Sequence, residues 1–302
     1  MRRRISFFLS LFSFHSLISA QTIQEKMSTS EAVVLGLVEG ITEYLPVSST
    51  GHLILASQLM GMGEDEVFRS SVNTYLVVIQ LGAILAVLTV YGKYIKKIIR
   101  GIFNRDQEGR QLFVFLMIAF IPSAIVGLLL GDFIATYLFG LWCTSIAWFV
   151  GGLALLKWNG KESSVSTGLE MKDLTPKKAV IIGSMQVIAM WPGVSRSLVT
   201  IVGGRFVGLS LQSSLIFSFL LGMITLSSAT LYKLLNSGTE MLEALGLYTI
   251  LLGIVVAYFS AWIAVKTMVA YLKKHGLGLF GIYRILLAFS TVLLIYFGYL
   301  EA

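Results

Sequence analysis

Two short polar segments in an otherwise apolar chain hold the side chains that could do chemistry. They are EGITEYLPVSSTGH, residues 39–52, and WPGVSRS, residues 191–197. Together the segments supply two carboxylates, several hydroxyls, an imidazole and a guanidinium. Such groups attack phosphorus, move protons and hold phosphate oxygens, so the two segments predict phosphoryl-transfer chemistry.

Glu39 and Glu43 are four residues apart, so a helix places both carboxylates on one face. A charged carboxylate at the centre of a bilayer costs about 2.5–3.5 kcal/mol on insertion scales, and two neighbours repel each other. They need a cation, a proton or an arginine, unless one of them sits at a wet interface without a role. Mg²⁺ or Ca²⁺ prefers such oxygen ligands and would bridge the pair to a diphosphate. We therefore predict Glu39 and Glu43 as ligands of a divalent cation.

The residues after Pro46 open a second half-helix, whose free N–H groups and positive dipole suit an anion. Ser48, Ser49 and Thr50 lie at this start, where any of them could equally be an N-cap. Ser49 and His52 are three residues apart, close enough for the imidazole to take the hydroxyl proton. We predict Ser49 as the nucleophile and His52 as its base, with His52 as nucleophile left open.

The second segment places Arg196 at the start of another half-helix, between Ser195 and Ser197 and one turn before Thr200. A planar, permanently charged guanidinium with hydroxyls beside it is suited to bind phosphate. The alternative is that Arg196 only balances the glutamates. Gln186 is an amide in an apolar run, either a substrate-binding residue or a hydrogen bond between helices.

The composition places these segments in a membrane. Of 302 residues, 56% are hydrophobic and 13% are charged, against about 25% charged in soluble domains. The net charge of +7 does not indicate nucleic acid, because the basic residues cluster in loops between apolar stretches, as a positive-inside bias predicts. Cys143 is the only cysteine, so an internal disulfide is excluded.

Six stretches are long enough to cross a bilayer. They cover residues 74–91, 112–130, 135–156, 212–232, 245–265 and 280–299. The loops at 91–110 and 157–178 are basic and should be cytoplasmic, whereas the loop around Asp132 has no Lys or Arg and should lie outside.

Two further apolar stretches, 31–60 and 178–209, are interrupted by proline, which ends helices. Each half is too short to span, so we predict two re-entrant helix–loop–helix hairpins entering from opposite sides. The stretches resemble each other, with Gly36 and Gly183 in equivalent places, and three spans follow each. The prediction is an all-α polytopic membrane protein, an inverted repeat with halves at about 30–157 and 178–300 and its polar sites where the repeats meet.

The N-terminal stretch MRRRISFFLSLFSFHSLISAQ has a basic start, an apolar run and small residues. It predicts a signal peptide or extension over 1–26, before a single membrane domain at 27–302. An uncleaved anchor, or a protein that begins at Met27, are the alternatives.

EGITEYLPVSSTGH and PGVSRSLVTIVGG resemble the two signature segments of the undecaprenyl-diphosphatase family, the bacitracin-resistance phosphatases of bacterial membranes, and VVIQLGAILAV at 77–87 is similar to a third. The resemblance covers about residues 28–299. It implies hydrolysis of undecaprenyl diphosphate to the monophosphate, which recycles the lipid carrier of cell-wall synthesis. By the same resemblance the catalytic residues are Glu43, Ser49, His52 and Arg196. Leu198 and Val199 depart from the small residues frequent there in the family, and the N-terminal extension is also unlike it.

The predicted partners are a polyprenyl diphosphate and the bacterial plasma membrane, with the site open to the outer, periplasmic face. The predicted phosphate ligands are Ser48, Thr50, Ser195, Ser197, Thr200 and Gln186. A secondary transporter or a lipid flippase is the rival reading, since inverted repeats with broken helices also build carriers. The oligomeric state is not decided by the sequence, and a homodimer is one option.

Overall fold

The computed structural model describes residues 27–62, 65–158 and 168–301. The regular structure there is helical apart from one β-bridge between Leu169 and Leu209. The predicted all-α class is therefore confirmed. The predicted signal peptide at 1–26 lies outside the described residues, and the division of the chain at residue 27 stays a prediction.

All six predicted spans are present as helices long and apolar enough to cross a membrane. They are α4 and α5 (Glu66–Val78, Gln80–Val90), α7 (Gln107–Tyr137), α8 (Leu141–Trp158), α11 (Leu211–Leu245), α12 (Leu247–His275) and α13 (Gly278–Tyr296). Two predicted boundaries were wrong. Residues 135–137 belong to the end of α7, which continues through Pro122, and Leu245 belongs to the end of α11 and not to the next span.

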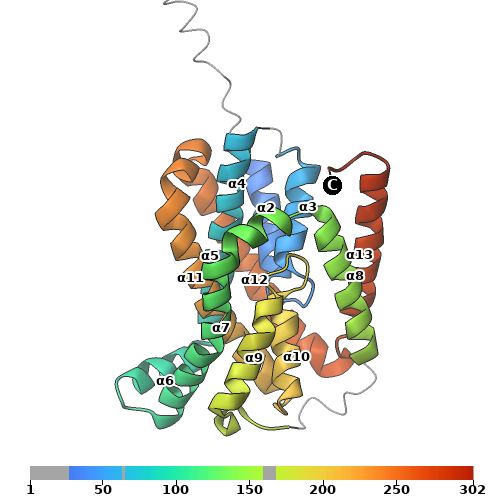
Figure 1. The fold of residues 1–302 in the computed structure, drawn as a ribbon. Coiled ribbons are helices and arrows are strands. Elements are labelled where there is room, and N and C mark those ends of the chain that lie inside the picture. Colours follow the sequence, from blue (N-terminus) through green and yellow to red (C-terminus); the bar gives the residue numbers. More distant parts are fainter. Residues whose placement is uncertain (1–26, 63–64, 159–167, 302) are drawn as a thin grey trace, which may run out of the picture.

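The two proline-containing stretches form broken helices, as predicted. The first consists of α2 (Thr29–Thr42), loop 1 (residues 43–48) and α3 (Ser49–Leu59); the second of α9 (Pro176–Ile188), loop 2 (residues 189–195) and α10 (Arg196–Phe206). Figure 1 shows these hairpins at opposite ends of the helix bundle, with their loops meeting near its middle. Entry into a bilayer from opposite leaflets fits this arrangement and stays a prediction.

Helix ends are set by local capping. Ser28 and Glu31 form a capping box at the start of α2, and Thr175 caps α9, whose first residue is Pro176. At the far side of each loop a serine, Ser48 or Ser195, caps the next half-helix. Both half-helices after the loops therefore begin at a defined residue.

The two halves of the chain pack on each other in a reciprocal way. Helix α2 packs on α12, and α9 packs on α7, so each hairpin begins on the second span of the other half. The third spans, α8 and α13, pack together, as do the first spans, α4–α5 and α11. Gly36 and Gly183 allow these contacts, because a Cβ at either would overlap a backbone carbonyl oxygen of the opposing helix. A two-fold inverted repeat, which stays a prediction, would produce these pairings.

Between α5 and α7 lies α6 (Gly92–Ile102), which carries Lys93, Lys96, Lys97 and Arg100. It folds back on the first turn of α7, where Lys97 pairs with Glu108. Figure 1 shows this hairpin projecting from the end of the bundle that also holds α9 and α10. The basic loop predicted to be cytoplasmic is thus on the same side as the start of the second hairpin.

Candidate active site

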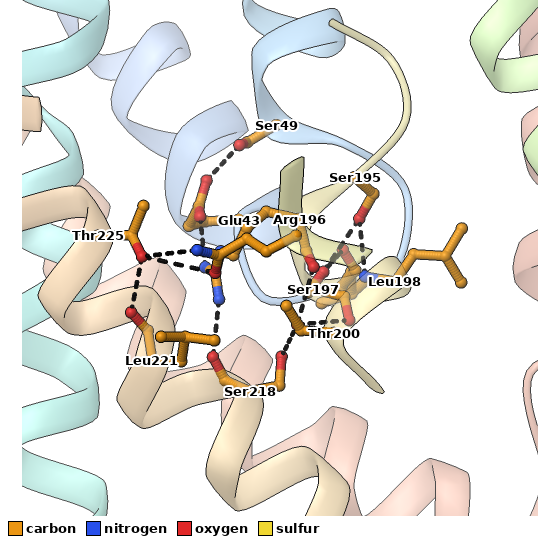
Figure 2. Close-up of polar contacts among 12 residues, drawn as sticks. Glu43, Ser49, Ser195, Arg196, Ser197, Leu198, Thr200, Ser218, Leu221 and Thr225 are labelled. Atoms are coloured by element: carbon orange, nitrogen blue, oxygen red, sulfur yellow. Dashed lines mark hydrogen bonds and ion pairs between the residues drawn. The ribbon is translucent and has the colours of Figure 1, made fainter. Parts of the chain in front are cut away.

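The tips of the two hairpins bring a guanidinium, a carboxylate and a hydroxyl into direct contact (Figure 2). Arg196 Nη2 lies 2.8 Å from Glu43 Oε1, and the Ser49 hydroxyl donates to the other oxygen, Glu43 Oε2. Glu43 is supplied by loop 1, Ser49 by the start of α3 and Arg196 by the start of α10. One carboxylate therefore links the acidic segment and the basic segment that the sequence singled out.

The Arg196 guanidinium is held in place from three sides. Its Nη1 donates to the Ser218 carbonyl oxygen of α11 at 2.9 Å, and its Cζ lies 5.5 Å from the centre of the Tyr44 ring. Gly222 of α11 leaves the space, since a Cβ there would overlap the guanidinium. Its buried Nε has no hydrogen-bond partner among the described residues. This leaves a donor for a phosphate oxygen.

Glu39 lies one helical turn before Glu43 and is fully buried. Neither of its carboxylate oxygens has a hydrogen-bond partner in the described part of the chain. A buried carboxylate without a partner is costly, so a cation or a proton is expected there. The described residues contain no group of three or more His, Cys, Asp or Glu side chains arranged for a metal. Mg²⁺ is often held by one or two carboxylates together with substrate phosphates, and Glu39 with Glu43 fits that smaller donor set.

His52 is not positioned as the base of Ser49. Its Nδ1 lies 2.7 Å from the Ser48 carbonyl oxygen, and its Nε2 lies 2.7 Å from the Tyr283 hydroxyl of α13. The imidazole stacks on the Tyr283 ring and meets Trp148 edge-on. The spacing along the helix was right for a contact between Ser49 and His52, but the hydroxyl turns to Glu43 and the ring turns to α13.

Two serines at the starts of α3 and α10, Ser48 and Ser197, also join the two loops. Gly193 N–H donates to Ser48 Oγ at 3.2 Å, and the Ser197 hydroxyl donates to the Leu45 carbonyl at 2.9 Å. Ser48 and Ser195 have φ values of 73° and 77°, which residues other than glycine rarely adopt. The same unusual backbone thus stands at the equivalent position of both hairpins. Strained backbone of this kind persists only where the surroundings enforce it.

The remaining predicted ligands fall into two groups. Ser195 and Ser197 lie 3.0 Å apart at their hydroxyls beside Arg196, and Thr50 lies in the first turn of α3. Thr200 and Gln186 point to neighbouring helices: Thr200 pairs with the Ser218 hydroxyl at 2.6 Å, and Gln186 Nε2 donates to Ser123 and Thr225 at 2.6 and 3.2 Å. This is the helix–helix bond that was the alternative for Gln186.

Three further residues at the site were not singled out from the sequence: Ser218, Gly222 and Arg284. Arg284 of α13 is fully buried and donates to carbonyls of both loops. Its signal was available, because an arginine within the span 280–299 is unusual in an apolar helix. Ser218 and Gly222 gave no such signal. Ser218 binds Arg196 through its backbone carbonyl and Gly222 contributes only space, and neither feature can be recognised in the sequence of a helix.

An apolar cavity of about 360 Å³ adjoins loop 2. Val194 and Leu198, on either side of Arg196 in sequence, are part of its wall. The other walls are formed by α8, α9 and α10, through residues such as Val150, Ala154, Met185 and Val202. A hydrocarbon chain can therefore lie next to the polar site.

Comparison with known proteins gives a consistent set of relatives. Residues 32–290 match the family model described as bacitracin resistance protein BacA. The chain is 41% identical to undecaprenyl-diphosphatase 3 of Acinetobacter baylyi over 257 residues, which cover 85% of this chain and 94% of the relative. It is 39% identical to an undecaprenyl-diphosphatase of Sorangium cellulosum, over 85% and 83% of the two chains, and 38% identical to one of Acinetobacter baumannii, over 92% and 100%.

Proposed function

The chain belongs to the BacA family of bacitracin resistance proteins, and from that premise we propose that it hydrolyses undecaprenyl diphosphate to undecaprenyl phosphate and inorganic phosphate. This reaction recycles the lipid carrier for cell-wall synthesis and gives bacitracin resistance. The observation that carries the proposal within the structure is the contact of Glu43 with both Ser49 and Arg196. That contact supports the proposed roles of Ser49 as nucleophile, Glu43 as proton acceptor and Arg196 as phosphate-binding cation.

In the proposed mechanism Arg196 and the N–H groups at the starts of α3 and α10 bind the diphosphate. Ser49 Oγ attacks the terminal phosphorus while Glu43 accepts the hydroxyl proton. The bond from that phosphorus to the bridging oxygen breaks, and undecaprenyl phosphate leaves. Water then hydrolyses the phosphoserine and releases inorganic phosphate. Glu43 replaces His52 as the base in this scheme because Glu43 is the group in contact with the hydroxyl.

A divalent cation, Mg²⁺ or Ca²⁺, is part of the proposal. Glu39 would hold it together with Glu43, and the support is that both oxygens of the buried Glu39 lack partners among the described residues. When bound, such an ion offsets the negative charge that carboxylates and phosphates bring together. Arg196 then remains the group that this chain supplies to the transferred phosphate.

The lipid part of the substrate suits the apolar surroundings. We place the first isoprene units in the cavity bounded by α8, α9 and α10, because its wall includes residues next to Arg196. The rest of the chain would lie in the bilayer. We further propose that the protein resides in the bacterial plasma membrane with the site open to the outer, periplasmic face, since the basic α6 hairpin marks the opposite end as cytoplasmic.

The decisive experiment is phosphate release from a long-chain isoprenyl diphosphate by purified protein. Ser49→Ala should lower kcat by about 10³-fold or more, whereas Ser57→Ala, a matched change further along α3, should leave it unchanged. Acid treatment of the trapped phosphoenzyme separates the two nucleophiles, because phosphoserine survives acid and phosphohistidine does not. A wild-type protein that binds the lipid but releases no phosphate would instead support the transporter or flippase reading.

A further inference from the structure

Arg284 is a fully buried cation without a counter-ion among the described residues. It lies in α13 with 0% of its surface exposed. No carboxylate of the described residues forms an ion pair with it. A buried charge of this kind is costly unless hydrogen bonds compensate for it. The hydrogen bonds of the guanidinium must therefore compensate for its burial.

All five N–H groups of Arg284 point at backbone carbonyl oxygens. Nη1 donates to Pro46 at 3.2 Å and Val194 at 3.0 Å, and Nη2 donates to Gly193 at 2.8 Å and Ala147 at 2.9 Å. The fifth, Nε, lies 3.4 Å from the carbonyl of Trp148. A guanidinium has five donors, so its hydrogen-bonding capacity is fully used. No N–H group of Arg284 therefore remains free to bind a substrate.

The five carbonyls belong to three separate segments. Pro46 is in loop 1, Gly193 and Val194 are in loop 2, and the other two are in α8. Arg284 thus joins both loops to one rigid pair of helices, because α8 and α13 pack closely together. Gly151 of α8 makes this possible, since a Cβ there would overlap the guanidinium and lie 2.8 Å from its Cζ.

These loop carbonyls lie close in sequence to the proposed catalytic groups. Pro46 lies between Glu43 and Ser49, and Val194 is two residues before Arg196. Each contact also lies just before a serine with positive φ, Ser48 in one loop and Ser195 in the other. Fixing the carbonyls on both sides to one planar group fixes the separation of the two loop tips.

We infer that Arg284 is a positioning residue: by holding loop 1 and loop 2 at one distance, it sets the geometry of Ser49, Glu43 and Arg196 without touching the substrate. This inference rests on the proposed hydrolysis for its kinetic part and on the structure alone for its loop-ordering part. Lysine keeps the charge, but a single ammonium cannot reach carbonyls on three segments in the plane of a guanidinium.

The test is Arg284→Lys, measured in two ways and compared with Arg110→Lys, the same change at the surface end of α7. Hydrogen exchange of backbone amides should rise in loops 1 and 2 together, while α11 and α12 are unchanged. The kcat for phosphate release should fall by about 10²-fold, as for a misplaced catalytic group, with a smaller change in KM. Gly151→Ala, which displaces the guanidinium without removing it, should give the same pattern, and Gly131→Ala, at a glycine with open space around it, should not.

The two proposals fail in different ways. Exchange that is unchanged, that rises in one loop only, or that rises throughout the protein would overturn the positioning role. A wild-type protein without phosphate release would sink the proposed function, yet the exchange measurement would still decide whether Arg284 orders the loops. In the Glu43→Gln background, Arg284→Lys should lower activity much less than in the wild type. The reason is that the proposed base, which Arg284 helps to position, has already been removed. If the fold-losses of activity of the two single variants simply multiply in the double variant, Arg284→Lys acts by general destabilisation, which would count against the inference.

Discussion

At the scale of single residues, Glu43 determines what the site can do. Its side chain is 5% exposed and that of Arg196 is 11% exposed, so water screens the pair poorly. Buried ion pairs are weak evidence of stability, because desolvation offsets their attraction, and removing one partner leaves an uncompensated charge. The additional contact of Glu43 with the Ser49 hydroxyl is unnecessary for charge balance. This contact is what favours a catalytic role over a merely structural one.

The position of Arg196 depends on the missing side chain at Gly222. We expect Gly222→Ala to displace the guanidinium from Glu43 and to lower kcat/KM by about 10²-fold, because an electrostatic donor would be misplaced. The control is Gly238→Ala on the same helix, where a Cβ meets only Leu234 at ordinary contact distances. Phosphate release by the two variants, at equal amounts of folded protein, checks this. Equal activity of both variants would show that the guanidinium is not held as described.

Glu39 should matter through a cation. We expect a chelator to abolish phosphate release and added Mg²⁺ or Ca²⁺ to restore it. Glu39→Gln removes the charge while keeping the size, so the cation concentration for half-maximal activity should rise by at least about tenfold. Glu31→Gln, at the surface end of the same helix, should leave that concentration unchanged. Metal-independent activity in the wild type would contradict a cation at this position.

The sequence predicted the members of this site better than their contacts. The contact of Arg196 with Glu43 was one of the options that the charges left open, because carboxylates at membrane depth need a cation, a proton or an arginine. The partner of Ser49 was predicted wrongly. Three residues of separation bring Ser49 and His52 to one helix face. Both imidazole nitrogens, however, are hydrogen-bonded elsewhere, one to the carbonyl of Ser48 and one to the hydroxyl of Tyr283. The hydroxyl of Tyr283 comes from α13, which no local spacing could reveal.

At the scale of helices, proline predicted the break in each hairpin, but a proline alone does not break a helix of this chain. Loop 1 contains Pro46 two residues before Ser48, loop 2 contains Pro192 next to Gly193, and both loops interrupt a helix. Pro122 lies inside α7, which continues for 15 residues beyond it to Tyr137. Ser123 follows Pro122, but its hydroxyl donates to the Phe120 carbonyl oxygen within the helix. The other neighbours are apolar, so no polar loop is available to replace the helix. The interruption between α4 and α5 at Ile79, in contrast, has no proline and was not predicted.

The proposed place of the lipid chain makes a prediction at this scale. Ala154 of α8 faces the apolar cavity, so Ala154→Phe should fill part of it. The KM for a long-chain diphosphate should rise by about tenfold, while hydrolysis of isopentenyl diphosphate, whose tail is too short to fill the cavity, is unchanged. Ala229→Phe places the same side chain on an exposed face of α11 and serves as the control. Equal effects on both substrates would locate the chain elsewhere.

At the scale of the whole molecule, the reciprocal packing gives the two loops their common position. Each hairpin begins on the second span of the other half. The position of each loop therefore depends on contacts with the opposite half of the chain. The inverted repeat stays a prediction, and it would account for the matching backbone angles of the serines that cap both half-helices.

The same arrangement predicts which residues face each side of the membrane. In a Cys143→Ser background, Leu59→Cys and Phe139→Cys should react with a membrane-impermeant maleimide added to intact cells. Arg105 follows α6 and Lys177 lies in the first turn of α9, and Figure 1 shows these two helices at the same end of the bundle. Arg105→Cys and Lys177→Cys should therefore react only after the membrane is opened. The pair Leu59 and Lys177 tests from which side each hairpin enters the membrane. Leu59 ends the first hairpin segment, α3, and Lys177 lies at the start of the second hairpin, in α9. Labelling of both from the same side would mean that the hairpins do not enter from opposite leaflets, and the two loops could not then meet as a symmetric pair at mid-membrane.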